Sequence, residues 1–319
     1  MALAFTIESS TLPSRYIHAA AAAPDAHYLL GSASGAPFTI ISRSHDARYR
    51  DLETGHTHTG TAAAIAIHEG RPQLAWCSTA DEVSWTADGT SGRAERVVDG
   101  LSGPSQRHLA LALDPDGTPV LLIGTGKSIL LARRTGGSWS VEQIATGCVM
   151  SAALAVDASG NAHVAWFDMN DRRTHLATRG AQVIVVDADH AGRWSVHLAI
   201  DADGIPHLAF VDSSKKTKKH VVHGVWRDGR FESSRAIENV PIPIDIGFAL
   251  DAQQRPLVMA HGTKAQGLVL ARREGKTWER VQVLPGLHGM PHLIAGAAIV
   301  GTFASYDEPE QYQRFVVVT

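Results

Sequence analysis

Short apolar runs interrupted by Asp and Gly recur along the chain. Four segments share one order of positions, in which an apolar strand, a tight Asp-x-x-Gly-like turn and a second apolar strand follow one another. They are HLALALDPDGTPVLLIGT from His108, SAALAVDASGNAHVAWFD from Ser151, SVHLAIDADGIPHLAFVD from Ser195 and DIGFALDAQQRPLVMAHG from Asp245. Two apolar strands joined by a short polar turn pair with each other, so each segment predicts a β-hairpin.

The spacing of these turns gives the size of the repeat. Aspartates begin the four turns at intervals of 43, 44 and 50 residues, at Asp114, Asp157, Asp201 and Asp251. This is the period of a four-stranded propeller blade. Weaker copies of the hairpin start at Ile17, Thr61 and Pro291. The sequence therefore predicts seven blades.

Each hairpin is followed by two more predicted strands, joined by a glycine-containing turn and an aromatic residue, as in RRTGGSW and REGKTW. The last repeat lacks one strand, and ALAFTIESS at residues 2–10 has no other partner. We expect this N-terminal strand to complete the seventh blade and close the ring, which removes its open edges. The prediction is a single all-β propeller domain over residues 1–319, with antiparallel blades near 16–59, 60–104, 105–147, 148–192, 193–241, 242–286 and 287–319 plus 2–10.

The repeats resemble those of bacterial seven-bladed β-propellers whose blades read like LALDxxGxPHLAFxD. The GGSW and GKTW turns are distantly similar to the Asp-box turns of sialidase-type propellers, but they lack the leading Ser-x-Asp. The resemblance implies a fold and no specific functional family. Sialidase chemistry is not implied, because neither an Arg-Ile-Pro element nor an ordered arginine triad is present.

Composition excludes several classes of partner and cofactor. A formal net charge of -3, with no basic block beyond KKTKKH at 215–220, argues against nucleic-acid and membrane partners. The two cysteines, Cys77 and Cys148, are typical of a reducing compartment. With no signal peptide or membrane span visible, we expect a cytoplasmic protein. The sequence is compatible with a monomer but does not determine the oligomeric state. The sequence contains no P-loop, dinucleotide fingerprint or nucleophile elbow, so no nucleotide cofactor is expected.

Histidine is the unusual feature, with 17 residues in the chain. Hairpin geometry places the starts of the inner strands and the ends of the second strands on one rim, opposite the Asp turns. Candidate metal ligands on this rim are His18, His108, His197 and His292. Candidate catalytic residues are His108, His197, Arg107, Tyr16, Asp245 and His261. Neutral imidazole binds metals and also acts as a base near neutral pH, so either use fits this pattern.

The leading hypothesis is an enzyme with a small-molecule or sugar-derived substrate at a histidine-rich axial site. Its chemistry would be of lyase, isomerase or hydrolase type, with a histidine base or one divalent metal ion, and Arg107 would orient an anionic group. The alternatives are a lectin-like propeller with saccharide sites between blades and a scaffold for protein partners. The histidines could also simply line a water-filled axial channel without forming a site. A metal pair at His56 and His58 is a weaker candidate.

Other polar residues of the repeat are predicted to have structural roles within the blades. The turn aspartates can accept backbone N–H groups of their own turns. His163 and His207 recur at equivalent positions of second strands, which is typical of packing residues. Asp168, Asp212 and Asp307 follow second strands and can cap the next loop.

Overall fold

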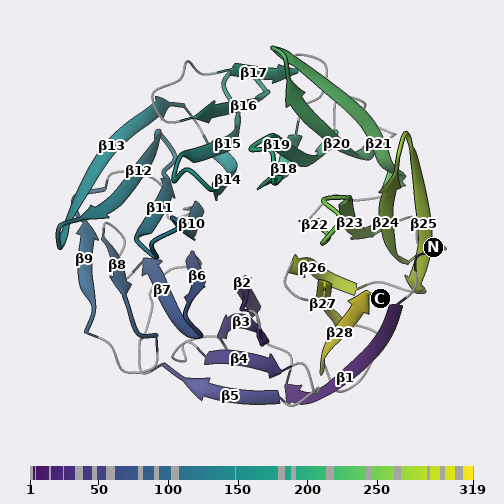
Figure 1. Ribbon diagram of the computed structural model, residues 1–319, viewed down its shortest axis with the longest axis horizontal. Helices are drawn as coiled ribbons and strands as arrows, with labels where there is room; N and C mark the ends of the chain where they lie inside the picture. The colour runs from purple at the N-terminus through teal and green to yellow at the C-terminus, as the bar shows by residue number, and fades with distance from the viewer. Residues whose placement is uncertain are drawn as a thin grey trace. The chain divides into compact units, whose positions relative to one another are not determined.

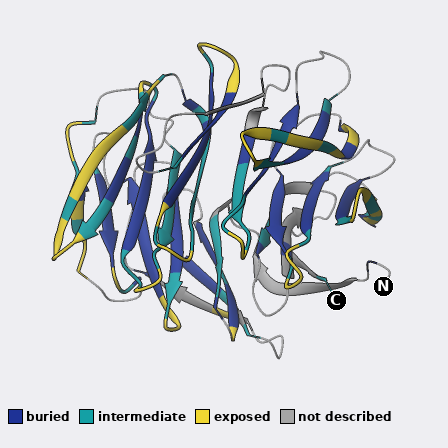
Figure 2. Ribbon diagram, turned by 45° about the horizontal axis from the view of Figure 1, so that its top comes forward, coloured by how far each residue is buried: buried dark blue, intermediate teal, exposed yellow. Residues whose placement is uncertain are grey.

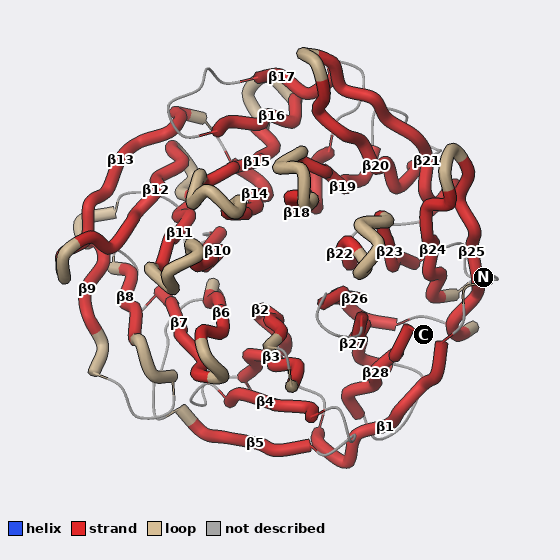
Figure 3. The backbone as a smooth tube through the Cα atoms, viewed as in Figure 1, coloured by secondary structure: helices blue, strands red, loops and turns tan. Residues whose placement is uncertain are grey.

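The computed structural model consists of β-strands joined by loops, with no helix in the part of the chain that it describes (Figure 3). No helix of that part is long and apolar enough to span a lipid bilayer. The described residues are 3, 5–13, 16–23, 25–32, 39–44, 49–54, 62–77, 82–89, 93–101, 108–147, 149–178, 184–187, 192–212, 219–240, 246–261, 267–285, 288–294, 299–305 and 312–318.

The chain divides into two compact units. The N-terminal unit comprises Tyr16–Asp171 and Leu176–Ile184, and the C-terminal unit comprises Met1–Arg15, Arg172–His175 and Val185–Thr319. Seven four-stranded sheets are described, and within each sheet strands adjacent in sequence are neighbours, apart from the sheet that includes the N-terminal strand. The predicted all-β propeller of four-stranded antiparallel sheets is confirmed. That the propeller is a single domain stays a prediction.

Four sheets belong wholly or mostly to the N-terminal unit, and their strands are labelled in Figure 1; parts of β16 and β17 of the fourth sheet belong to the other unit. Sheet 1 contains β2 (Tyr16–Ala22), β3 (Ala26–Ser32), β4 (Thr39–Ser44) and β5 (Tyr49–Glu53). Sheet 2 contains β6 (Ala63–His68), β7 (Arg71–Cys77), β8 (Val83–Thr86) and β9 (Glu95–Val98). Sheet 3 contains β10 (His108–Leu113), β11 (Pro119–Gly124), β12 (Ser128–Thr135) and β13 (Ser138–Thr146). Sheet 4 contains β14 (Val149–Val156), β15 (Ala162–Asp168), β16 (Arg173–Thr178) and β17 (Ile184–Asp187).

The C-terminal unit holds three sheets. Sheet 5 contains β18 (Gly192–Ile200), β19 (Pro206–Asp212), β20 (Lys219–Arg227) and β21 (Arg230–Val240). Sheet 6 contains β22 (Gly247–Leu250), β23 (Pro256–His261), β24 (Leu268–Glu274) and β25 (Thr277–Leu284). Sheet 7 contains β26 (His288–Ile294), β27 (Ile299–Ser305), β28 (Tyr312–Val318) and β1 (Phe5–Pro13).

The N-terminal strand completes the last sheet, as the sequence predicts. β1 pairs antiparallel with β28, with Phe5 opposite Val318. Just before β1, the backbone N–H of Leu3 donates to Glu279 Oε1 at 2.7 Å. The Leu3 side chain packs in a buried cluster with Leu257 and Leu270 of sheet 6. The N-terminus is therefore held by two consecutive sheets of its unit.

The Asp turns are built by hydrogen bonds within the turn. At Asp114 the backbone N–H donates to the Thr118 carbonyl at 3.0 Å, and Gly117 N–H donates back to the Asp114 carbonyl at 2.9 Å. Gly117 has a φ of 81°, a conformation that glycine adopts without steric cost. Gln254 takes the corresponding place in the turn of sheet 6, with a φ of 61°.

Hydrophobic layers between consecutive sheets form the core of each unit. In β10, Leu109 and Leu111 pack in a cluster with Trp85 of sheet 2, whereas Ala110 packs with Trp166 of sheet 4. Successive side chains of a strand point to opposite faces, so each inner strand contributes to two layers. The second strands are buried throughout in sheets 3, 4 and 5, while β13 and β21 expose many of their side chains (Figure 2).

The aromatic residues after the outer turns pack in two ways. Trp139 packs edge-on against Trp85 of the preceding sheet, with ring centroids 5.5 Å apart. Phe231 instead stacks on Phe210 of its own sheet, with ring centroids 6.1 Å apart, and lies over Gly224. The difference arises because an outer strand also borders the neighbouring sheet, which a hairpin pattern does not show.

Candidate functional site

The two central histidine candidates occupy related positions in different units. His108 lies six residues before Asp114 in β10, and His197 lies four residues before Asp201 in β18; both side chains are half-buried. His108 shares its strand face with Ala110 and is turned toward sheet 4. His197 shares its face with Ala199, which packs against the cluster between sheets 5 and 6. Both histidines therefore face the sheet that follows their own.

Local contacts differ between the two histidines. His197 Nε2 lies 2.8 Å from Ser195 Oγ, a hydrogen bond that fixes the ring within β18. His108 is opposite Gly124, where a Cβ atom would lie only 3.2 Å from the Cβ of His108. A glycine at the end of β11 thus leaves room for the imidazole.

The remaining candidates are only partly described. His292 is half-buried in β26 opposite Thr302, and His261 is half-buried at the end of β23 opposite Leu268. His18 and Tyr16 lie in β2, but their side chains fall outside the described part. Four further candidates lie outside the described residues altogether: Arg107, Asp245, His56 and His58.

A metal site stays a prediction. Within the described ranges, no group of three or more His, Cys, Asp or Glu side chains is placed to hold a metal ion. His108 belongs to the N-terminal unit, whereas His197 and His292 belong to the C-terminal unit. The described side chains by themselves therefore do not form a ligand set.

On the opposite rim, the turn aspartates accept backbone N–H groups of their own turns, as predicted. Asp157 Oδ1 accepts the backbone N–H groups of Ser159 and Asn161, each at 2.9 Å. Its Oδ2 lies 3.1 Å from Nε2 of buried His163. In sheet 5, Asp201 Oδ2 makes the same contact with His207 Nε2 at 3.1 Å. These histidines are packing residues, in agreement with the sequence analysis.

Links between the turns join consecutive sheets on this rim. Arg133 donates to Asp114 Oδ2 at 2.6 Å and to the Gly160 carbonyl at 2.7 Å, which connects the turns of sheets 3 and 4. Between sheets 5 and 6, Ala202 N–H donates to Gln254 Oε1 at 3.0 Å. Hydrogen bonds thus link one pair of consecutive Asp turns in each unit.

Near the outer strands, two tryptophans and an arginine meet between sheets 2 and 3. The Arg134 guanidinium lies 5.2 Å from the centre of the Trp85 ring, beside Trp139. The same guanidinium donates twice to Glu95, at 3.0 and 3.1 Å. A bidentate arginine–carboxylate pair on an aromatic ring is a rigid polar surface.

The same arrangement recurs between sheets 5 and 6 with a histidine ring. Trp278 packs edge-on against His223, with centroids 5.6 Å apart, and its Nε1–H donates to Ser234 Oγ at 3.0 Å. Arg273 Nη1 lies 3.4 Å from His223 Nδ1. Sequence reasoning missed both clusters, although Arg134 and Arg273 each lie five residues before a tryptophan in RR-x-G-x-[ST]-W, a repeated signal.

Grooves open beside these clusters, between the outermost strands of consecutive sheets. The β9–β13 groove has a volume of about 580 Å³ and is lined by Arg93, Ala94, Glu95, Arg96, Val97, Gly137, Ser138 and Trp139. The β21–β25 groove has a volume of about 450 Å³ and is lined by Ile237, Glu238, Asn239, Val269, Arg280, Val281 and Gln282. Both volumes are in the range of small-molecule sites.

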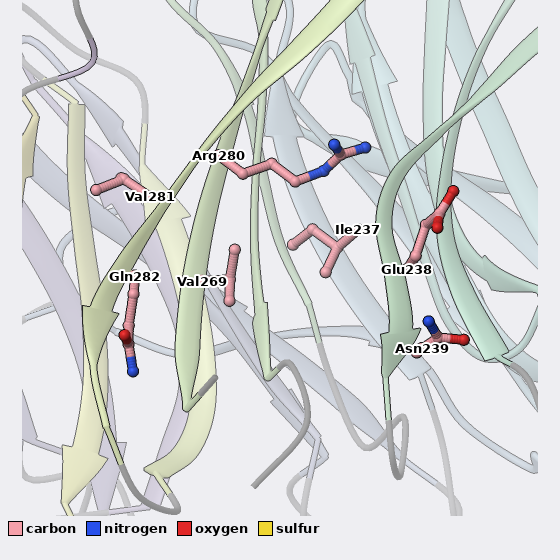
Figure 4. A pocket seen from close by; sticks show the side chains of 7 residues that line it. All are labelled: Ile237, Glu238, Asn239, Val269, Arg280, Val281 and Gln282. Carbon is pink, nitrogen blue, oxygen red and sulfur yellow. The ribbon is translucent and has the colours of Figure 1, made fainter. Parts of the chain in front are cut away.

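The β21–β25 groove combines an apolar floor with polar edges (Figure 4). Ile237 and Val269 lie in its middle, and Arg280 reaches from β25 toward β21. The Arg280 guanidinium is fixed there, because it donates to the Ala236 carbonyl at 2.6 Å and to the Arg235 carbonyl at 3.2 Å. Exposed Glu238 completes the opposite edge.

The class of protein defined by these features is an all-β propeller with polar grooves between its sheets. No protein-family model and no curated protein matches the sequence.

Solved structures match the fold. Polysaccharide lyase Uly1 is 12% identical with a TM-score of 0.61, covering 97% of this chain and 91% of its own. Virginiamycin B lyase from Staphylococcus aureus is 10% identical with a TM-score of 0.63, covering 99% of both chains. The fucose-specific lectin from Aleuria aurantia is 12% identical with a TM-score of 0.53, covering 87% of this chain and 98% of the lectin. At these identities the likeness concerns the fold, which enzymes and carbohydrate-binding proteins share.

Proposed function

We propose that this protein binds saccharides in the grooves between the outermost strands of consecutive sheets. The observation that carries the proposal is that such a groove is present in each unit, between β9 and β13 and between β21 and β25. A repeat architecture builds similar sites at similar places, because every pair of consecutive sheets has the same geometry. The lectin and the polysaccharide lyase among the structural neighbours support a sugar ligand.

The chemistry of the lining suits a sugar ring. Ile237 and Val269 can contact its C–H groups, while Arg280 and Glu238 can donate to and accept from its hydroxyl groups. In the other groove, Glu95 and Arg96 supply the polar groups and Trp139 supplies an aromatic surface. Both grooves contain acidic and basic side chains, which favours a neutral or weakly charged saccharide.

Glycan-array screening followed by calorimetric titration tests this proposal. We expect a saccharide that binds with a stoichiometry above one per chain. Glu238→Ala removes one groove edge and should weaken binding at one site by about tenfold, the value of one charge-assisted hydrogen bond. Glu232→Ala is the matched control, an exposed glutamate of the same strand outside the groove. Binding that Glu238→Ala leaves unchanged, or the absence of any glycan ligand, would contradict the proposal.

A second candidate is an enzyme of lyase, isomerase or hydrolase type that uses the histidines of the inner strands. The hydrogen bond between Ser195 Oγ and His197 Nε2 favours it, because it orients a half-buried imidazole as a general base requires. The two lyases among the structural neighbours are further support. We include in this candidate the divalent metal ion on His18, His108, His197 and His292, together with the expected roles of Arg107, Tyr16, Asp245 and His261.

Metal analysis of the purified protein and turnover by His108→Ala and His197→Ala test the enzymatic candidate. A polysaccharide panel with ultraviolet detection of unsaturated products would report lyase activity. We expect each variant to lose at least a hundredfold in kcat/KM, the usual contribution of a general base. Variants that retain full activity, in a protein free of metal, would exclude the histidines from catalysis.

A further inference from the structure

Sheets 5 and 6 meet around a buried row of titratable groups. Figure 1 shows these sheets as neighbours within the C-terminal unit. His223 of β20 is fully buried, and its ring also faces Phe248 of β22 and Trp278 of β25, at centroid distances of 5.8 and 5.6 Å. His207 of β19 is 7% exposed, and its Nδ1 lies 3.1 Å from His223 Nε2.

The ends of this row fix the direction of every hydrogen bond. Arginine only donates, so Arg273 Nη1 donates to His223 Nδ1 at 3.4 Å. His223 then carries its proton on Nε2 and donates to His207 Nδ1 at 3.1 Å. His207 carries its proton on Nε2 and donates to the Asp201 carboxylate at 3.1 Å. The chain runs from a cation to an anion through two neutral imidazoles.

This directed chain has no place for an additional proton. A proton on His223 Nδ1 would point at the Arg273 N–H groups, and one on His207 Nδ1 would point at the Nε2–H of His223. Either would leave two donors facing each other in a buried layer. We propose that the chain Arg273–His223–His207–Asp201 is an acid-sensitive contact between sheets 5 and 6, which is intact only while both imidazoles are neutral.

The equivalent pair in sheet 4 lacks this property and serves as an internal comparison. His163 Nε2 contacts Asp157 Oδ2 at 3.1 Å, as His207 contacts Asp201. Its Nδ1, however, lies 3.1 Å from Thr178 Oγ1 of the third strand. A hydroxyl group can rotate either to donate or to accept, so Thr178 fixes no direction for the hydrogen bonds of His163. In sheet 5, by contrast, a second histidine, His223, lies at this point.

Burial and the neighbouring arginines favour the neutral imidazoles, whereas Asp201 opposes them. The groups on this face of sheet 5 are Asp201, His197, Arg227 and Glu232, and sheet 6 contributes Arg273 and Arg280. Burial lowers the pKa of His207, and the Asp201 carboxylate only partly opposes this effect. Burial, the proximity of His207 and the Arg273 charge place the pKa of His223 well below its usual value of 6.5.

The expected pH dependence follows from these lowered pKa values. In the unfolded chain both histidines bind protons near pH 6.5, whereas in the folded contact they stay neutral at that pH. The stability that the contact contributes is therefore fully present above pH 6.5 and is lost as the pH falls below it. Two such histidines raise the unfolding equilibrium constant of the C-terminal unit about 100-fold between pH 7.5 and 5.5.

Urea unfolding of the full chain at pH 7.5 and 5.5, followed by tryptophan fluorescence, tests this inference. We expect the 100-fold change in the wild type and at most about tenfold in His223→Leu, which removes one titrating group and also the N–H that faces His207 Nδ1. His163→Leu is the matched control and should retain the full change. A wild-type change below threefold, or an unaltered change in His223→Leu, would overturn the inference.

A measurement on the wild type keeps the inference testable if His223→Leu does not fold. Long-range proton–nitrogen NMR spectra distinguish the imidazole tautomers. We expect both His207 and His223 as neutral Nε2–H tautomers that do not titrate in the folded protein between pH 7.5 and 5.5. A His223 ring that becomes charged in the folded state within this range would refute the contact. Neither experiment involves a saccharide, so the outcome is independent of the proposed function.

Discussion

Replacing Asp157 by asparagine measures how strongly a turn carboxylate stabilises its blade. Asp157 accepts hydrogen bonds from the backbone of Ser159 and Asn161 at 2.9 Å and from Asn161 Nδ2 at 3.0 Å, and it contacts His163. Burial raises the pKa of the carboxyl group, but the hydrogen bonds from Asn161, His163 and Ser159 outweigh burial and lower the pKa to about 2. Asparagine keeps the shape and loses the charge.

The size of the effect follows from this pKa. Relative to the ordinary value of 3.8, a pKa of about 2 corresponds to about 2.4 kcal/mol of stability at neutral pH. Screening by solvent takes little of this, because the Asp157 side chain is only 12% exposed. The folded-state pKa is depressed, so the stability is fully present above pH 4 and declines toward pH 2. About half of it should remain at pH 3.

Urea denaturation of the wild type and Asp157→Asn at pH 7 and pH 3 provides the assay. We expect a loss of about 2.4 kcal/mol in the unfolding free energy at pH 7 and about half of that at pH 3. Asp203→Asn is the control, since Asp203 is an exposed residue in the corresponding turn of sheet 5 and should cost less than about 0.5 kcal/mol. An equal loss at both pH values would refute the electrostatic reasoning.

Three further substitutions probe the contacts between and within sheets. Arg133→Met should cost about 3 kcal/mol in urea unfolding, because it leaves the buried Asp114 carboxylate without its cation; adding Asp114→Asn should recover part of the loss. Gly224→Ala should cost about 2 kcal/mol and lower the melting temperature, because the new Cβ would overlap the Phe231 ring; a neutral result would show that the ring moves freely. Leu3→Ala should cost about 2 to 3 kcal/mol and raise hydrogen exchange in sheet 6, and unchanged exchange would contradict the anchoring of the N-terminus.

Much of the fold could be predicted from local patterns. The hairpins at Asp114, Asp157, Asp201 and Asp251 form as their sequences indicate, because strand alternation and turn residues act over a few positions. The pairing of β1 with β28 was also predictable, since an outer strand was missing from the last repeat. The structural role of the turn carboxylates followed from their own short loops.

The candidate site was less predictable. His108 starts its inner strand as expected, whereas His197 lies within β18, which already begins at Gly192. Which sheet each histidine faces depends on its distance from the turn, and that shows only when the register is known. The outer grooves and the clusters at Trp85 and His223 combine residues of consecutive sheets. The local RR-x-G-x-[ST]-W pattern marks an arginine and a tryptophan of each cluster, but not their partners on the preceding sheet.

The sequence by itself therefore determined the repeat, its four-stranded sheets and the residues of its turns, because backbone conformation and strand amphipathicity are local properties. Only the tertiary structure decided that His207 and His223 form one hydrogen-bonded row, and that Arg273 lies at its end. Contacts of that kind depend on the register of strands within a sheet and on how one sheet packs against the next. Side chains 50 residues apart, such as His223 and Arg273, meet for that reason alone.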